Sequence, residues 1–189
     1  KNTDPDKLMN KLFKLTPLQD SFACNFNVLI NGKPMVLGVK GILREWTLFR
    51  INCIKRQIAF DIEKKSDKLH LLKGLKKILL DIDKAIKIIR ETEQESEVVP
   101  NLMKGFDIDQ VQAEFIAEIK LRNLNKEYIL KRTDEIDSLE KEIEDLQKTF
   151  KDESRIKKII IKELKEVAQK YGKPRRTEII MEETIVDDT

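Results

Sequence analysis

The feature that most constrains this chain is how rarely glycine and proline interrupt it. Sixty-six residues without glycine separate Gly105 from Gly172, and no proline lies between Pro100 and Pro174. The uninterrupted stretches are rich in Leu, Ile, Lys and Glu, which favour helix, whereas glycine and proline are the residues that most often end one. The pattern predicts two long helical runs around a short middle segment, that is, an arm that leads outward, turns through a small tip and returns.

Composition and charge support this arrangement. Of the 189 residues, 38% are charged and 40% hydrophobic, which is too apolar for a disordered chain and suits helices with much solvated surface. Residues 39–80 carry eleven Lys or Arg against four Asp or Glu, and residues 134–153 carry three against nine. If the two runs pair, a basic helix lies along an acidic one. This favours the pairing and its register, although each exposed ion pair contributes only ~0–1 kcal/mol.

Local signals place the shorter elements. Residues 6–21 predict a short helix broken by Pro17, and Asn31-Gly32 between two extended segments, 25–30 and 34–38, is a strong hairpin signal. A second sheet edge is predicted at residues 175–181, as a strand. Because an isolated two-stranded ribbon is only marginally stable, we expect both to join a sheet supplied by other parts of a longer protein.

Apolar residues recur at helical spacing along both runs. In the outgoing run they are Ile42, Trp46, Phe49, Ile54, Ile58, Ile62, Leu69, Leu72, Leu75, Leu79 and Ile82. In the returning run they are Ile136, Leu139, Ile143, Leu146 and Phe150, then Ile156, Ile160, Leu164, Val167 and Tyr171. Between these two sets Asp152 is placed to cap a new helix, and so is Asp81 or Asp83 near the end of the outgoing run. In the middle segment we expect a helix over 98–104 ended by Gly105, then a capped helix over 111–119.

The predicted fold is therefore mainly α: a long antiparallel coiled-coil arm, a small helical globular tip and a short β hairpin at the base. The expected divisions are a base with the hairpin (1–38), an outgoing helix with a bend near 81–83 (39–92), the tip (93–124), returning helices (125–172), and a strand with an acidic tail (173–189).

Side chains for bond chemistry are scarce. His70 is the only histidine, no Cys or carboxylate lies near it at ligand spacing, and we interpret it as a residue packed on a helix face. Two cysteines, Cys24 and Cys53, form no disulfide framework and are expected to be reduced. No apolar run approaches the roughly 18 residues of a membrane helix. We assign no catalytic residue and no metal ligand, and we expect no membrane partner.

A basic cluster lies on the outgoing helix: Arg44, Arg50, Lys55 and Arg56, followed by Lys64, Lys65 and Lys68. Such charge can contact nucleic-acid phosphates, but a solvated face opposite an acidic helix is the more common role. Arg175 and Arg176 form a second, smaller candidate for phosphate contact.

The order of motifs resembles one known family. Leu12 to Gln19, Ser21-Phe22, Asn25 and Gly32-Lys33-Pro34 are similar to a segment of the A subunit of bacterial type IIA DNA topoisomerases, DNA gyrase and topoisomerase IV. The resemblance continues at Arg50, Lys55-Arg56, Leu69 to Leu75, Asp81-Ile82-Asp83, Gln110 to Leu124 and Lys173 to Ile179. It covers about residues 10–180, and it departs from the family pattern at Leu124 to Tyr128.

The resemblance implies a function. In that family this segment is the end of the tower and the coiled-coil arm with its tip, and two tips meet as the exit gate for transported DNA. The resemblance further implies a homodimer that works with a B subunit on double-stranded DNA in the cytoplasm, near the nucleoid. The catalytic tyrosine lies in another part of the same polypeptide, and ATP and Mg²⁺ belong to the B subunit. We therefore expect this segment to need no cofactor and to be inactive alone, because neither Tyr128 nor Tyr171 has a catalytic setting.

For the tip contact the candidates are the apolar residues of 106–124, with Phe115 the first choice: Phe106, Ile108, Phe115, Ile116, Ile119, Leu121 and Leu124. The alternative is that they only form the tip's own core. Two other functions stay open at this point, a free-standing coiled-coil scaffold or dimerisation module and a basic helical arm that binds DNA directly.

Overall fold

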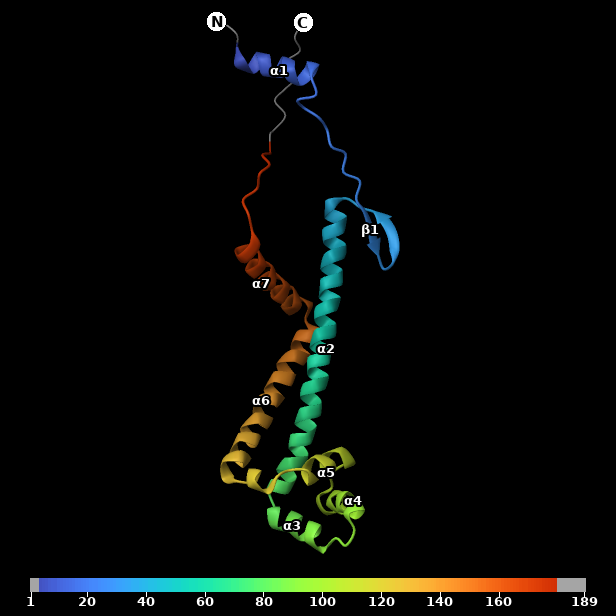
Figure 1. The fold of residues 1–189 in the computed structure, drawn as a ribbon, viewed down its shortest axis with the longest axis vertical. Helices are drawn as coiled ribbons and strands as arrows, with labels where there is room; N and C mark the ends of the chain where they lie inside the picture. The colour runs from blue at the N-terminus through green and yellow to red at the C-terminus, as the bar shows by residue number, and fades with distance from the viewer. Residues whose placement is uncertain (1–3, 180–189) are drawn as a thin grey trace. The chain divides into compact units, whose positions relative to one another are not determined.

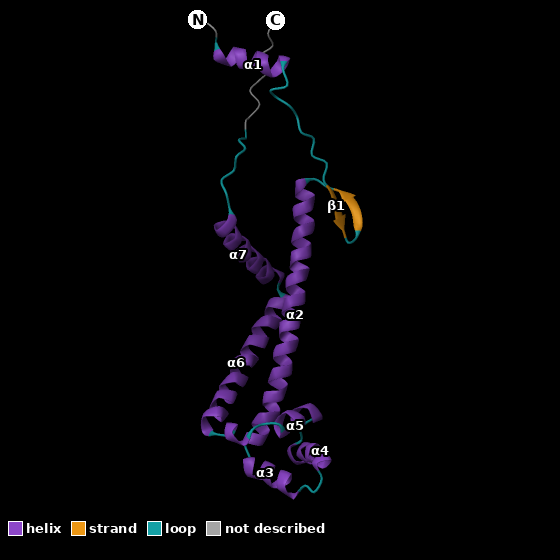
Figure 2. Cartoon of the chain, in the orientation of Figure 1, coloured by secondary structure: helices purple, strands orange, loops and turns teal. Residues whose placement is uncertain are grey.

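The computed structural model describes residues 4–179, and helices make up 74% of that part of the chain. The elements in chain order are α1 (Pro5–Leu15), β1 (Asn27–Ile30), β2 (Lys33–Val36), α2 (Val39–Leu79), α3 (Ile82–Glu91), α4 (Glu95–Phe106), α5 (Gln110–Ala117), the 3₁₀ turn η1 (Leu121–Asn123), α6 (Lys126–Lys151) and α7 (Glu153–Tyr171) (Figures 1 and 2). The chain divides into two compact units, Lys1–Phe49 and Arg50–Thr189. The predicted fold class, mainly α with a short hairpin, is confirmed.

The first unit contains the predicted hairpin. Strands β1 and β2 pair antiparallel, with Asn27 opposite Val36 and Ile30 opposite Lys33. The turn residues Asn31 and Gly32 both have positive φ, 51° and 76°, which is the backbone that a tight two-residue hairpin turn requires.

Helix α1 is shorter than predicted. It begins behind Asp4, whose side chain accepts from the amide of Asp6, and it ends at Leu15 rather than near residue 21. Thr16 is already extended, because a residue before proline is biased away from helix, and both its amide and its hydroxyl donate to the carbonyl of Leu12. Residues 20–26 are irregular.

In the second unit α2 pairs antiparallel with the returning helices, and α6 lies beside it in Figure 1. Ile51, Ile54 and Ile58 of α2 form a buried cluster with Ile156 and Ile160 of α7. The ion pairs that join the helices show the direction, because the start of the α2 run pairs with α7 and its later part with α6: Arg50–Glu163 (2.7 Å), Lys65–Glu142 (2.5 Å), Lys68–Glu135 and Lys73–Glu140 (2.7 Å). The basic α2 therefore lies along the acidic α6, as the charge pattern predicts, whereas α7 is itself rich in lysine.

The break between the returning helices falls at the predicted residue. Asp152 alone separates α6 from α7: its amide closes the end of α6, and its carboxylate accepts from the amide of Ser154 at the start of α7. Apolar residues of the predicted stripe are buried from Ile136 through Ile160, with the exception of half-buried Leu146 and 40%-exposed Phe150. Beyond Ile160 the stripe is exposed to solvent, at Leu164, Val167 and Tyr171.

Two further local predictions are wrong, besides the end of α1. Helix α4 does not end at Gly105: it continues to Phe106, and Asp107 takes the left-handed conformation, φ 50°, that closes it. Residues 172–179 are irregular and form no strand, whereas 180 and 181 lie outside the described residues. A strand needs a neighbour for its hydrogen bonds, and β1 and β2 pair only with each other within residues 4–179.

Candidate functional site

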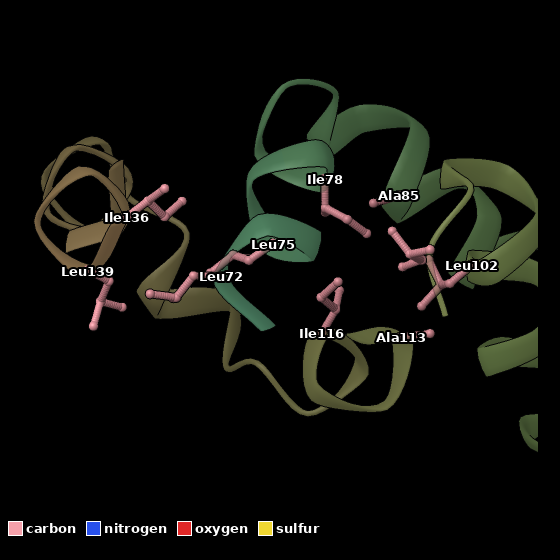
Figure 3. Packing of buried hydrophobic residues seen from close by; sticks show 10 residues of the cluster. Leu72, Leu75, Ile78, Ala85, Leu102, Ala113, Ile116, Ile136 and Leu139 are labelled. Carbon is pink, nitrogen blue, oxygen red and sulfur yellow. The ribbon is translucent and has the colours of Figure 1, made fainter. Parts of the chain in front are cut away.

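The tip, which we define as α3, α4, α5 and η1, shares one buried core with the arm. Apolar residues of the end of α2 and of α6 close it from the arm side. Figure 3 shows Ile78, Leu102 and Ile116 converging on one interior, with Leu72 of α2 directed toward Ile136 and Leu139 of α6. Leu75 and Leu102 are fully buried. Because this core closes within one chain, apolar side chains outside it can contact other molecules.

Aspartate side chains begin two of the tip helices, α3 and α5, whereas α4 begins at Glu95, three residues before the predicted start, without a side-chain cap. Asp81 caps α3 by accepting from the amide of Lys84. Asp109 and Gln112 form a capping box at α5, in which each side chain accepts from the other residue's backbone amide (2.9 and 3.2 Å). The hydrogen bond from the Gln112 amide is the main reason that the pKa of Asp109 is lowered.

Polar contacts hold α5 against α2. The Gln112 side-chain amide donates to the carbonyl of His70 (2.7 Å), and the His70 ring contacts the carboxylate of Asp109. Gly74 makes room for this contact, because a Cβ at that position would stand 2.8 Å from the Gln112 side chain. His70 thus lies on a helix face, half exposed, as interpreted from the sequence. Its carboxylate partner, Asp109, is 39 residues away along the chain and could not be inferred from sequence spacing.

Two lysines and a glycine fix α4. The Nζ atoms of Lys77 and Lys84 donate to the carbonyls of Asp107 and Gly105 (each 2.6 Å), which are among the unpaired acceptors at the end of a helix. A Cβ at Gly105 would stand 2.5 Å from Cδ1 of Ile88. Gly105 therefore allows α4 to approach α3, which is its structural role in place of the helix stop expected from sequence.

The predicted contact residues of the tip differ in exposure. Two lie in the core, each 7% exposed: Ile108 and Ile116. Three are half-buried and pack against the core: Phe106, Phe115 and Ile119. Leu124 is half-buried, and Leu121 is 76% exposed. Of this set, Leu121 is the residue most open to a partner.

Further apolar side chains of the tip region face solvent outside the predicted set: Leu80 after α2, Ile86 and Ile89 on α3, Val111 on α5 and Leu130 on α6. The sequence pattern places α3 in the arm, so its surface falls outside the predicted tip. The available signal is the spacing of Ile82, Ile86 and Ile89, which forms a stripe that borders core residue Ala85.

Part of the predicted basic cluster is neutralised. Arg50 pairs with Glu163, whose hydrogen bond raises the Arg50 pKa, and Lys65 and Lys68 pair with carboxylates of α6. Lys64 lies over the ring of Phe60 on its own helix, 4.8 Å from the centroid. Fully open positions are left at Arg44, Arg56, Arg175 and Arg176, while Lys55 is half-buried.

Two kinds of site are absent from residues 4–179. No three His, Cys, Asp or Glu side chains stand close enough together to hold a metal ion. No helix in this range combines the length and apolar character that crossing a membrane requires.

Comparison with known proteins decides the family. The family model for the A subunit of DNA gyrase/topoisomerase IV matches residues 1–165. The chain belongs to this family. Among its relatives, the A subunit of DNA topoisomerase 4 from Escherichia coli K12 is 39% identical over 175 residues, which are 92% of this chain and 23% of the relative. The A subunit of DNA gyrase from Clostridium acetobutylicum is 37% identical over 187 residues, 99% of this chain and 22% of the relative.

A third relative shows the same coverage. The A subunit of DNA gyrase from Metamycoplasma arthritidis is 34% identical over 179 residues, 95% of this chain and 20% of the relative. This gyrase/topoisomerase IV A-subunit chain therefore spans about a fifth of the length of the relatives it matches.

Proposed function

We propose that the tip is the self-association surface through which two A subunits close the exit gate of a type II DNA topoisomerase. In this proposal the complete enzyme passes one DNA duplex through a transient double-strand break in another, with ATP and Mg²⁺ handled by a B subunit. The arm positions the tip and takes no part in bond chemistry. The cytoplasmic, nucleoid-associated setting implied by the resemblance belongs to the same proposal.

The observation that carries the proposal is the combination of a closed core, shared by tip and arm, with exposed apolar side chains outside it. Leu80, Val111 and Leu121 are 81%, 61% and 76% exposed. Apolar side chains that stay exposed on or beside a unit whose core is already closed can serve as an interaction surface. A homodimer related by a two-fold axis needs one self-complementary patch. A patch of modest area suits a gate, because it can hold two subunits together and still allow them to separate.

Family membership favours this function over a free-standing scaffold, because the chain is a member of the A-subunit family along at least residues 1–165. Direct DNA binding by the arm is less supported, since three cations of the predicted basic cluster are paired with carboxylates of α6 and α7.

The test is sedimentation equilibrium of the chain. We expect a reversible dimer, and we expect Leu121→Asp to weaken it about tenfold or more, because a charge in an apolar contact must be desolvated without a partner. Leu15→Asp is the matched control: Leu15 is 81% exposed and lies in the other unit. A wild-type chain that stays monomeric at high concentration would refute the proposal. If Leu121→Asp and Leu15→Asp weakened the dimer equally, the contact would not lie in the tip.

A further inference from the structure

Helix α3 presents two different faces. Ala85 is 5% exposed and Ile88 packs against Gly105 of α4, so this side belongs to the tip core. Ile86 and Ile89 point elsewhere, at 39% and 43% exposure, and half-buried Ile82 continues their line at intervals of four and three residues. Ten residues long, α3 therefore carries an apolar stripe, Ile82, Ile86 and Ile89, that borders the core face and is only partly covered within residues 4–179.

The charges beside this stripe are unpaired within the described residues. Asp83 precedes Ile86 by three positions and Arg90 follows it by four, so all three lie on one side of the helix. Both charged residues are exposed, and neither forms an ion pair within residues 4–179. The other cations of α3 are engaged: Lys87 pairs with Glu91, and Lys84 donates to the carbonyl of Gly105.

The arrangement is self-complementary. At a rise of about 1.5 Å per residue, Asp83 lies about 4.5 Å to one side of Ile86 along the axis and Arg90 about 6 Å to the other. An antiparallel copy of the same helix, turned about a two-fold axis near Ile86, places arginine opposite aspartate at both ends. A parallel copy would instead place like charges side by side, which is unfavourable.

We propose that α3 packs antiparallel against α3 of a second copy of this chain, with Asp83 of each copy paired to Arg90 of the other and Ile86 at the centre. This inference rests on the proposed self-association of the tip and specifies its contact. The occupant is a second copy because an acid at one end and a base at the other match the same helix reversed, which is the condition for a closed two-fold interface.

The size of the contact suits this role. One short helix face offers far less than the roughly 800 Å² per partner of a standard stable interface, so α3 alone gives a weak, reversible contact. The two reciprocal charge pairs then fix the relative orientation of the helices, because other registers leave these charges unpaired or opposite like charges. Other exposed apolar residues of the tip, such as Leu121, can enlarge the contact.

A charge-reversal cycle tests the proposal by sedimentation equilibrium of the chain. Asp83→Arg alone places two arginines opposite each other at each end, and Arg90→Asp alone places two aspartates there. We expect each single variant to weaken the dimer about tenfold or more, because close like charges at an interface are costly. The double variant, Asp83→Arg with Arg90→Asp, restores opposite charges and should return the dissociation constant to within about threefold of wild type.

Glu91→Lys is the matched control. It changes charge equally on the same helix, about 140° around the axis from Ile86, and should leave the dimer unchanged. Circular dichroism of every variant establishes that α3 and the tip remain folded. If neither single variant weakens the dimer, or if the double variant does not restore its dissociation constant, the α3 contact is wrong. Self-association of the tip would still stand in either case. A monomeric wild type would overturn both.

Discussion

Gly74 shows how a single residue can have opposite local and tertiary preferences. Within a helix, alanine is more favourable than glycine by about 1 kcal/mol. At Gly74, however, the new Cβ would stand 2.8 Å from the side chain of Gln112. That residue belongs to α5, is 7% exposed and packs against α2. We expect Gly74→Ala to lower the free energy of unfolding by about 1–3 kcal/mol, as measured in urea.

The control for that variant is Gly41→Ala in the same helix. Its nearest neighbour, the Leu37 side chain, is 3.4 Å away, so helix propensity should dominate there and the substitution should be neutral or slightly stabilising. If the two variants changed stability equally and in the same direction, the close contact between Gly74 and Gln112 would have no energetic weight.

Asp109 predicts an acid sensitivity of the tip. Its pKa is lowered, first by the amide hydrogen bond from Gln112 and then by the His70 ring. A carboxylate with a lowered folded-state pKa binds its proton less tightly than in the unfolded chain. Its contribution is therefore present above the unfolded value, about 3.9, and is lost as the pH falls through the lower folded value.

We expect Asp109→Asn to reduce the steepness with which unfolding free energy falls below about pH 4. Urea titrations at several pH values measure this slope. Asp134→Asn is the control, because Asp134 is exposed on α6 and makes no ion pair within residues 4–179. An unchanged slope in Asp109→Asn would mean that the capping box does not distinguish the folded from the unfolded carboxylate.

At this scale the sequence predicts what is local. Asp152 is identified as a cap, and Asp81 as one of two candidates, because the residues that decide a cap lie within three positions. The tertiary roles of Gly74 and Gly105 could not be predicted in this way. Each is set by a side chain far along the chain, Gln112 and Ile88.

At the scale of elements, the arm depends on a few buried isoleucines. Ile156 of α7 is fully buried against α2, whereas Ile161, five residues later on the same helix, is 51% exposed. We expect Ile156→Ala to cost about 2–5 kcal/mol through lost burial and a cavity, and Ile161→Ala to stay within about 0.5 kcal/mol. Thermal or urea unfolding checks the pair, and a similar loss in both would mean that the two faces of α7 are not differentiated.

Helices were predictable as elements, but their packing was only partly so. The start of α2 at Val39 and the break at Asp152 follow from local signals, and periodicity identified the stripe of the returning helices. Periodicity could not say where burial stops. Leu164 and Val167 continue the same spacing as Ile156 and Ile160, yet the structure leaves them exposed, since burial depends on what a partner element supplies.

For the molecule as a whole, the sequence predicts a contact within residues 106–124, and that contact stays a prediction; helix α3, which packs against α4, falls outside it. Residues 106–124 were singled out because they lie between the two long runs, and Leu121 among them is open. Ile86 and Ile89 were assigned to the arm, because the bend at Asp81 gives no indication from sequence alone that α3 folds onto α4. Which apolar residues of the tip are core and which are surface required the tertiary structure.

The charge distribution predicts the response of the whole chain to DNA. The net charge is +3, and Arg50, Lys65 and Lys68 of the basic cluster already meet carboxylates of α6 and α7. Arg44 and Arg56 are left exposed on α2. We expect weak binding to duplex DNA that depends steeply on salt, because phosphate contacts release counterions and carry no sequence information.

Fluorescence anisotropy with a duplex at about 50 and 200 mM salt measures this dependence. Arg56→Gln should lower the slope of log binding constant against log salt by about one phosphate contact, roughly 0.9, if that residue touches DNA. Lys65→Gln serves as the control, because its ammonium is held by Glu142 and should contribute little to the slope. Tight binding that persists at the higher salt would contradict this prediction and favour the arm as a direct DNA-binding surface, with the tip contact then secondary to it.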